Sequence, residues 1–139
     1  MILFLNILGQ LWLSPVSLIG FLTGLVLQIF GQVKLIEFKE NAFDWEIVGC
    51  SWLEHDRRNW TATTIGNSIF YHKKFINNKK TRNHEKRHVQ QGMVFGIFFI
   101  PVYIVFSWII KFFYKKLSPY RDNPFEKDAR DYADRKEKL

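Results

Sequence analysis

The sequence is nearly devoid of cysteine and has two long stretches without charge, and both deficits restrict what the protein can be. Cys50 is the single cysteine, so the chain can form neither an internal disulfide nor a thiol cluster for a metal. No charged side chain occurs from Met1 to Val33 or from Val89 to Ile110. Soluble folds distribute charge along their amphipathic elements, whereas such segregation is typical of proteins that meet lipid.

The charge balance also excludes some partners. The formal net charge is +7, but no nucleic-acid recognition motif accompanies it, so we expect no nucleic-acid partner. Lysines and arginines beside apolar segments instead favour anionic lipid headgroups. With 139 residues, the chain is long enough for one compact unit. We therefore expect a small membrane protein with membrane lipid as a partner.

The first apolar stretch predicts a retained membrane helix over residues 1–33. No basic residue precedes it, and it is longer than the roughly 7–15 residues of a signal-peptide core. Pro15 should kink or break this helix. Gly20 and Gly24 share one helix face, which suits close packing of another helix but is also common in apolar helices without a partner.

The following residues, 34–139, are expected to form the rest of the fold. Phe43, Trp45 and Ile47 alternate with more polar residues, which predicts a strand with one buried face. Residues 60–71 predict two short strands around a Gly66-Asn67 turn, and residues 54–59 read as a polar loop. The sequence thus predicts a small antiparallel β-element, and with it an α+β membrane protein.

Two helices are expected in the C-terminal half. Thr81 or Asn83 can cap a helix that begins at about His84. This helix leads into the apolar segment 89–110, which is embedded in the larger unit and should kink or break at Pro101. A short final helix should begin at Asn123-Pro124, because asparagine suits an N-cap and proline the first helical position.

The residues that carry chemistry are His84, Glu85 and His88, which form the pattern H-E-x-x-H. On a helix the two imidazoles lie on one face, close enough to share a metal ion. Glu85 lies where its carboxylate can reach a metal-activated water. Lys86 and Arg87 must point outward, since cations near a dication are unfavourable. The alternative is a basic, solvated helix start with two interfacial histidines.

The C-terminal half resembles small bacterial membrane-associated zincin-like proteins of the gluzincin type. The likeness rests on His84-Glu85-x-x-His88-Val89-x-Gln91, an apolar segment, and the stretch 120–130, which contains Asn123-Pro124-Phe125-Glu126. It covers about the last 80 residues, and residues 64–67 are similar to the edge strand that precedes the motif helix in such proteins.

This resemblance implies a site and an activity. His84, His88 and Glu126 would bind zinc, and Glu85 would be the catalytic base. The implied function is a membrane-associated zinc-dependent metallopeptidase that hydrolyses peptide bonds in an unidentified peptide or protein. A bacterial inner membrane, with the site on its cytoplasmic side, is the expected location.

Alternatives remain for individual residues. Glu126 also occupies the third helical position after Asn123, where a glutamate can close a capping box. Asp122 and Asp128 are then substitute ligands. His55 and His72 are expected to be loop histidines.

Alternatives remain for the function as well. The protein could be a non-enzymatic integral membrane protein, either a structural subunit or a lipid-surface adaptor, and another membrane protein is then a candidate partner. In a third interpretation, the protein binds the metal, but the metal has only a structural role.

The metal hypothesis constrains the apolar segment 89–110. A straight helix of this length would be ~30 Å long and would place Glu126 across the bilayer from His84. The segment must therefore break, most naturally near Pro101, and return to the same side as a helical hairpin. Basic residues flank both of its ends, which also indicates one cytoplasmic side. Gly92 and Gly96 continue the histidine face and could admit the third-ligand helix, although simple helix packing in lipid explains them equally well.

Overall fold

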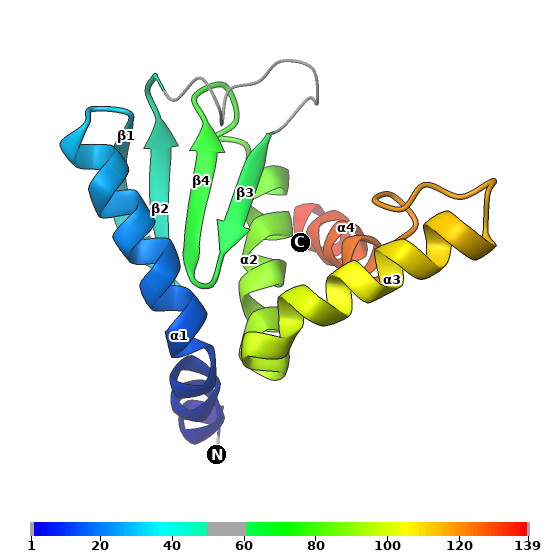
Figure 1. Ribbon diagram of the computed structural model, residues 1–139. Helices are drawn as coiled ribbons and strands as arrows, with labels where there is room; N and C mark the ends of the chain where they lie inside the picture. Colours follow the sequence, from blue (N-terminus) through cyan, green and yellow to red (C-terminus); the bar gives the residue numbers. More distant parts are fainter. Residues whose placement is uncertain (1, 50–60, 139) are drawn as a thin grey trace.

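The computed structural model describes residues 2–49 and 61–138, and it is a mixed α+β fold with a small sheet (Figure 1). The helices are α1 (Ile2–Ile29), α2 (Lys79–Phe95), the 3-10 turn η2 (Gly96–Phe98), α3 (Phe99–Phe113) and α4 (Pro124–Glu137). The strands are β1 (Val33–Lys39), β2 (Ala42–Ile47), β3 (Ala62–Ile65) and β4 (Ser68–His72). They form a four-stranded sheet in the order β1-β2-β4-β3.

One face of the sheet packs against α1. The side chains of Trp45 on β2 and Phe70 on β4 point to this face and form a cluster with Leu27 of α1. Gly24 lies directly against the Trp45 ring, where a Cβ atom would overlap the indole. Close packing at Gly20 and Gly24 is present as expected, but the partner is the sheet instead of another helix. Gly20 faces the backbone of Ile65 in β3.

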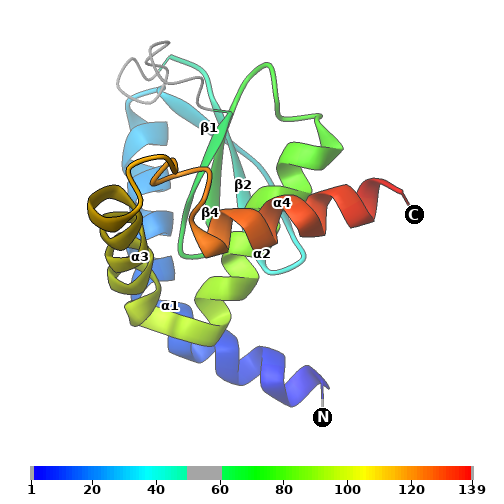
Figure 2. The same cartoon turned by 90° about the vertical axis from the view of Figure 1, so that its right-hand side faces the viewer.

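The opposite face of the sheet packs against α2. Successive strand residues point to opposite faces, so Ile69 and Tyr71 lie away from α1 and form a second cluster with Val89 of α2. Leu13 of α1 also joins this cluster at the end of the sheet. Figure 2 shows the resulting layers: the sheet lies between α1 on one side and α2 with α4 on the other.

The sheet is mixed, so the expectation of an antiparallel β-element is wrong in part. β1 pairs antiparallel with β2, and β3 pairs antiparallel with β4. However, β4 inserts next to β2 and runs parallel to it, with Trp45 opposite Phe70. This pairing joins segments that are far apart in the sequence, and local periodicity carries no information about it.

Other expectations for the sheet are confirmed. The strand around Trp45 and the hairpin at Gly66-Asn67 are present, and Gly66 has a φ of 61°. The turn between β1 and β2 places Glu40 and Asn41 at φ values of 53° and 65°, as a two-residue hairpin turn of type I′ requires. The expected polar loop at 54–59 lies outside the described residues.

The motif helix differs from expectation at both ends. It begins at Lys79, earlier than His84, because Asn78 is the N-cap and accepts a hydrogen bond from the Thr81 amide at 3.0 Å. The break in the apolar segment lies at Gly96, whose φ is 57°, a conformation that glycine adopts readily. Pro101 lies in the first turn of α3, where it is tolerated, so it does not cause the break.

Gly92 and Gly96 face α1 instead of a ligand helix. A Cβ atom at Gly92 would lie 3.0 Å from Leu13, and one at Gly96 would overlap the Trp12 ring. The helix that carries Glu126 approaches α2 from another side. The expected use of this glycine face is therefore wrong.

Two stretches are long and apolar enough to cross a membrane, judged by length and composition. They are Asn6–Ile29 and Lys79–Phe113. The second is not straight, because α3 turns sharply away from α2 after η2 (Figure 1). The expected bend in the apolar segment is thus confirmed.

Candidate metal centre

α2 places two histidines one turn apart with their ring nitrogens facing the same point. The Nε2 atoms of His84 and His88 lie 3.2 Å apart, and the rings are nearly perpendicular at 86°. His88 is buried, and His84 is partly buried. The spacing of four residues therefore produces the shared face that the sequence predicts.

α4 brings a carboxylate to the same point. Glu126 Oε2 lies 3.3 Å from His84 Nε2, and its Oε1 lies 3.3 Å from His88 Nε2. One ligand atom from each of the three residues lies within 4.8 Å of the others, so the group could hold a metal ion. The structure thus joins the two motif histidines and the glutamate from a separate helix.

The competing role of Glu126 as a capping residue is not used. The Asn123 side chain caps α4 by accepting a hydrogen bond from the Phe125 amide at 3.0 Å. The Asn123 amide, which a capping box would satisfy with Glu126, donates instead to the Tyr120 carbonyl at 3.2 Å. The carboxylate of Glu126 is therefore directed entirely toward the histidines and Tyr103.

Burial and charge act in opposite directions on Glu126. Burial alone would raise the pKa of its carboxyl group, but contact with His84 and His88 outweighs that effect and lowers the pKa far below its usual range. The carboxylate is ionised in this surrounding. Its Oε2 atom is buried, and no described group donates a well-aligned hydrogen bond to it, which leaves a lone pair available toward the histidines.

A hydrogen-bond chain fixes the orientation of His88. Gln91 Nε2 donates to the Phe125 carbonyl at 3.0 Å and to Asp128 Oδ2 at 2.8 Å. Both partners are acceptors, so the amide oxygen must face His88 Nδ1, 2.8 Å away. His88 Nδ1 therefore carries a proton, and Nε2 is the ring nitrogen that faces the centre.

The charged residues inside the motif point away from the centre, as expected. Lys86 pairs with Glu40 at 2.9 Å, and Arg87 pairs through two nitrogens with Asp128 at 2.7 and 3.2 Å. Asp128 is thereby occupied and is not a substitute ligand. The pKa of its carboxyl group is lowered, chiefly by the hydrogen bond from Arg87.

The remaining candidates lie away from the cluster. Asp122 accepts a hydrogen bond from the Ser118 amide at 2.7 Å. His72 is the last residue of β4 and not a loop residue as expected, and its Nδ1 accepts a hydrogen bond from the Lys74 amide at 3.2 Å. His55 lies outside the described residues.

α3 holds the glutamate in place. The Tyr103 hydroxyl donates to Glu126 Oε1 at 3.0 Å. Asn123, which is fully buried, donates to the Tyr103 carbonyl at 3.1 Å and to Ser107 Oγ at 2.9 Å. The Phe125 ring packs among aromatic rings of the same apolar segment: Phe95, Phe99, Tyr103 and Phe106. The apolar segment is thus part of the site's scaffold.

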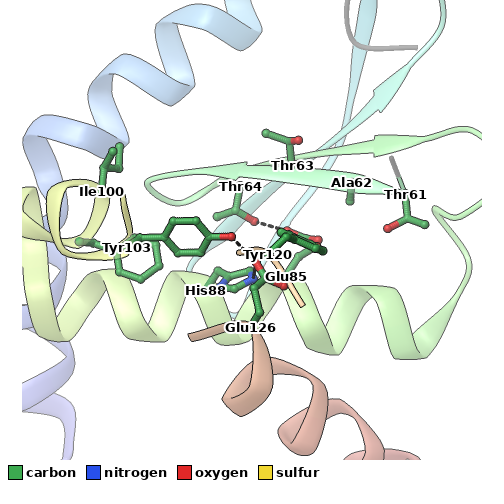
Figure 3. A pocket seen from close by; sticks show the side chains of 11 residues that line it. Thr61, Ala62, Thr63, Thr64, Glu85, His88, Ile100, Tyr103, Tyr120 and Glu126 are labelled. Atoms are coloured by element: carbon green, nitrogen blue, oxygen red, sulfur yellow. Dashed lines mark hydrogen bonds and ion pairs between the residues drawn. The ribbon is translucent and has the colours of Figure 1, made fainter. Parts of the chain in front are cut away.

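Glu85 lies beside the cluster, at a cavity of about 660 Å³. Its Oε2 accepts a hydrogen bond from the Thr64 hydroxyl of β3 at 2.7 Å. Figure 3 shows Thr64, Tyr103 and Tyr120 around the carboxylates, with β3 along one side of the cavity and α3 along another. β3 is at the edge of the sheet, but it contains only Thr64 and Ile65 of the edge strand expected at residues 64–67, because Gly66 and Asn67 form the turn to β4.

Sequence reasoning overlooked two contributors to the site. Tyr103 is the sole ionisable residue in the uncharged run 89–110, and with Ser107 it marks one polar helix face, which was an available signal. Thr64 belongs to a recognised strand, but nothing in its sequence context indicates contact with Glu85.

Comparisons with protein-family models, curated proteins and solved structures found no match for this chain.

Proposed function

We propose that the protein is a membrane-associated, zinc-dependent peptide hydrolase, with His84, His88 and Glu126 as metal ligands. The observation that supports the proposal is the convergence of these three side chains from α2 and α4. Their chemistry suits zinc, since two imidazoles and one carboxylate leave a fourth position for water or substrate, as in catalytic zinc sites.

The spacing of the ligand atoms supports this choice of metal. Atoms bound to a tetrahedral zinc at ~2.0–2.1 Å stand about 3.3–3.4 Å from one another. The Nε2 atoms of His84 and His88 are 3.2 Å apart, which is close to this spacing, and Glu126 places a different oxygen 3.3 Å from each of them. With Nδ1 of His88 held by Gln91, the Nε2 atom of His88 and both carboxylate oxygens of Glu126 face the same point.

Bound zinc would supply Lewis-acid chemistry, polarising a carbonyl group and acidifying a water molecule. Glu85 would accept one proton from that water as the water oxygen bonds to the peptide carbon. The carbon–nitrogen bond then breaks, and Glu85 returns the proton to the leaving nitrogen, which gives one carboxyl and one amino product. Thr64 orients the Glu85 carboxylate through its 2.7 Å hydrogen bond.

Arg130 and Tyr120 lie near Glu126 in the sequence and are candidates for stabilising negative charge on the carbonyl oxygen, and the better of them is Tyr120. It lines the same cavity as Glu85 and Glu126 (Figure 3), so its hydroxyl can approach a substrate there. Arg130 donates to the backbone carbonyl of Arg121 and is not among the residues that line the cavity. The substrate would be a peptide or protein segment, and the cytoplasmic face of a bacterial inner membrane is the proposed location.

Zinc content of the purified full chain tests the ligand assignment. Elemental analysis should find about one zinc per chain, lost in His84→Ala and in Glu126→Ala. His72→Ala and Glu137→Ala are matched controls, because the His72 ring contacts the nearby Lys74 amide and Phe75 ring, away from the cluster, and Glu137 lies at the exposed end of α4. Full zinc content in Glu126→Ala would remove the glutamate from the site.

A second variant separates catalysis from structure. Glu85→Gln should retain zinc and lose peptide hydrolysis, measured with a fluorogenic peptide library in lipid vesicles. Zinc binding with no hydrolysis by the unaltered protein would favour the structural-metal alternative. Absence of zinc binding would favour the non-enzymatic membrane protein, structural subunit or lipid-surface adaptor.

A further inference from the structure

The outward face of α1 is apolar along its whole described length. Its buried positions, Leu13, Ser17, Gly20, Gly24 and Leu27, repeat every three or four residues and face the protein. The opposite stripe includes Leu18, Leu22, Val26 and Ile29, which are 49–81% exposed. A helix on the surface of a soluble domain carries polar residues there, so this stripe requires an apolar environment.

α3 presents a second apolar surface. One stripe of α3 faces the protein: Ile110 is buried, Tyr103 and Ser107 make hydrogen bonds with α4, and the rings of Phe99 and Phe106 pack on Phe125. Val105, Trp108 and Phe112 are 52–67% exposed. α3 and the C-terminal two-thirds of α1 lie toward the same side of the molecule, while α4 lies on the other side (Figure 2).

Neither helix is free to cross a bilayer. α3 has 15 residues, or about 22 Å, against a hydrocarbon core of about 30 Å. α1 is long enough, but the sheet is packed along it from Leu13 to Leu27. A crossing would draw the sheet's charged residues, such as Lys34 and Lys39 on exposed positions of β1, into hydrocarbon, which is unfavourable.

The charge pattern identifies the type of surface. No acidic residue occurs between Val89 and Arg121, whereas Lys111, Lys115, Lys116 and Arg121 lie at or beyond the end of α3. Exposed Trp108 and Tyr114 accompany them, and aromatic rings with basic residues favour the interface of an anionic bilayer.

We propose that α1 and α3 bind side-on to one leaflet of an anionic lipid bilayer, so that the protein is held in the interface and spans nothing. This arrangement replaces the expected N-terminal transmembrane helix. It is independent of the metal, because it rests on α1, α3 and the sheet alone. The cavity beside Glu85 then opens next to the lipid surface, since Ile100 and Tyr103 of α3 line it.

The depth of spin labels in vesicles tests the proposal. Cys50→Ser provides a cysteine-free background, into which Leu18→Cys, Leu22→Cys or Ile29→Cys is introduced singly. Vesicles contain phosphatidylglycerol and phosphatidylcholine. Accessibility to oxygen and to a water-soluble nickel complex reports depth. Side-on binding predicts similar depths of about 5–10 Å for all three, and Val105→Cys on α3 should agree.

The opposite results are equally distinct. A membrane-crossing α1 would spread the three labels over about 16 Å, because Leu18 and Ile29 are 11 residues apart. Labels that are immobilised and shielded from both oxygen and nickel would instead mean that a second copy or another protein covers this face. Either result overturns the proposal. Lys127→Cys on α4 is the control and should remain in water, since the Lys127 side chain is 56% exposed.

Discussion

The two apolar helices, α1 and α3, have similar compositions but contact the rest of the protein in different ways. α1 faces the sheet with small residues, including Gly20 and Gly24, so that the backbone of Ile65 and the Trp45 ring can approach closely. α3 faces α4 with Tyr103 and Ser107, which make hydrogen bonds. The difference shows that α1 contributes to the fold by close packing, whereas α3 positions the Glu126 carboxylate through hydrogen bonds.

The largest expected effect comes from filling the contact surface of α1. Gly24→Val places side-chain atoms inside the Trp45 ring, and overpacking should lower the free energy of unfolding by about 3 kcal/mol or more. Thermal unfolding in detergent, followed by circular dichroism, measures the loss. The control is Val26→Leu on the exposed stripe, which should change little. An unchanged melting temperature for Gly24→Val would mean that α1 does not pack on Trp45.

On the α3 side, Asn123→Ala should lower the free energy of unfolding by about 2–3 kcal/mol. The variant loses the cap of α4 and leaves the Tyr103 carbonyl and Ser107 without their donor. Asn78→Ala is a matched control, since Asn78 caps α2 from an exposed position and should cost about 1 kcal/mol. Equal losses would argue against a specific link between α3 and α4.

Tyr103→Phe should have a smaller, local effect. It removes the hydroxyl that donates to Glu126 and leaves the ring packing intact. Residues that orient a metal ligand typically contribute 10–100-fold to affinity, so zinc should bind about tenfold more weakly in competition with a chelator. Tyr114→Phe, at an exposed tyrosine, should leave zinc affinity unchanged. An unaltered affinity in Tyr103→Phe would limit α3 to a packing role.

The smallest effect should appear on the outward faces, where the two helices are equivalent. Val26 and Val105 are 51% and 52% exposed. Truncation to alanine at either position should alter the free energy of unfolding by no more than about 0.5 kcal/mol. Chemical denaturation in the same detergent provides the comparison. A much larger loss at one position would mean that its face packs against protein.

Local signals in the sequence predicted those parts of the fold that depend on neighbouring residues. Asn123-Pro124 begins α4 as expected, because cap and first-turn preferences act over a few residues. The Gly66-Asn67 hairpin and the shared face of His84 and His88 follow from similarly short distances along the chain. The bend in the apolar segment was also predicted, but from a topological requirement, and its position was wrong.

Features that depend on contacts between residues far apart in the sequence could not be predicted from local patterns. The parallel pairing of β2 with β4 depends on the position of β4 between β2 and β3 in the sheet, and no local sequence pattern predicts that position. The break at Gly96 depends on the Trp12 ring of α1, which occupies the space of a side chain. At the site, the sequence alone left Glu126 between two roles, and only the path of α3 and α4 in space directs its carboxylate toward the histidines.

The bend at Gly96 sets the direction of α3, and the direction of α3 affects where Glu126 lies relative to the two histidines. Both histidines lie on α2, while Glu126 is attached to α3 through Tyr103 and Asn123. Tyr103 is seven residues from Gly96, or about 10 Å along the helix. A rotation of about 6° at this pivot would therefore shift the carboxylate by roughly 1 Å, a distance comparable to the difference between a bound and an unbound ligand. The angle of α3 at Gly96 therefore determines how closely Glu126 approaches His84 and His88.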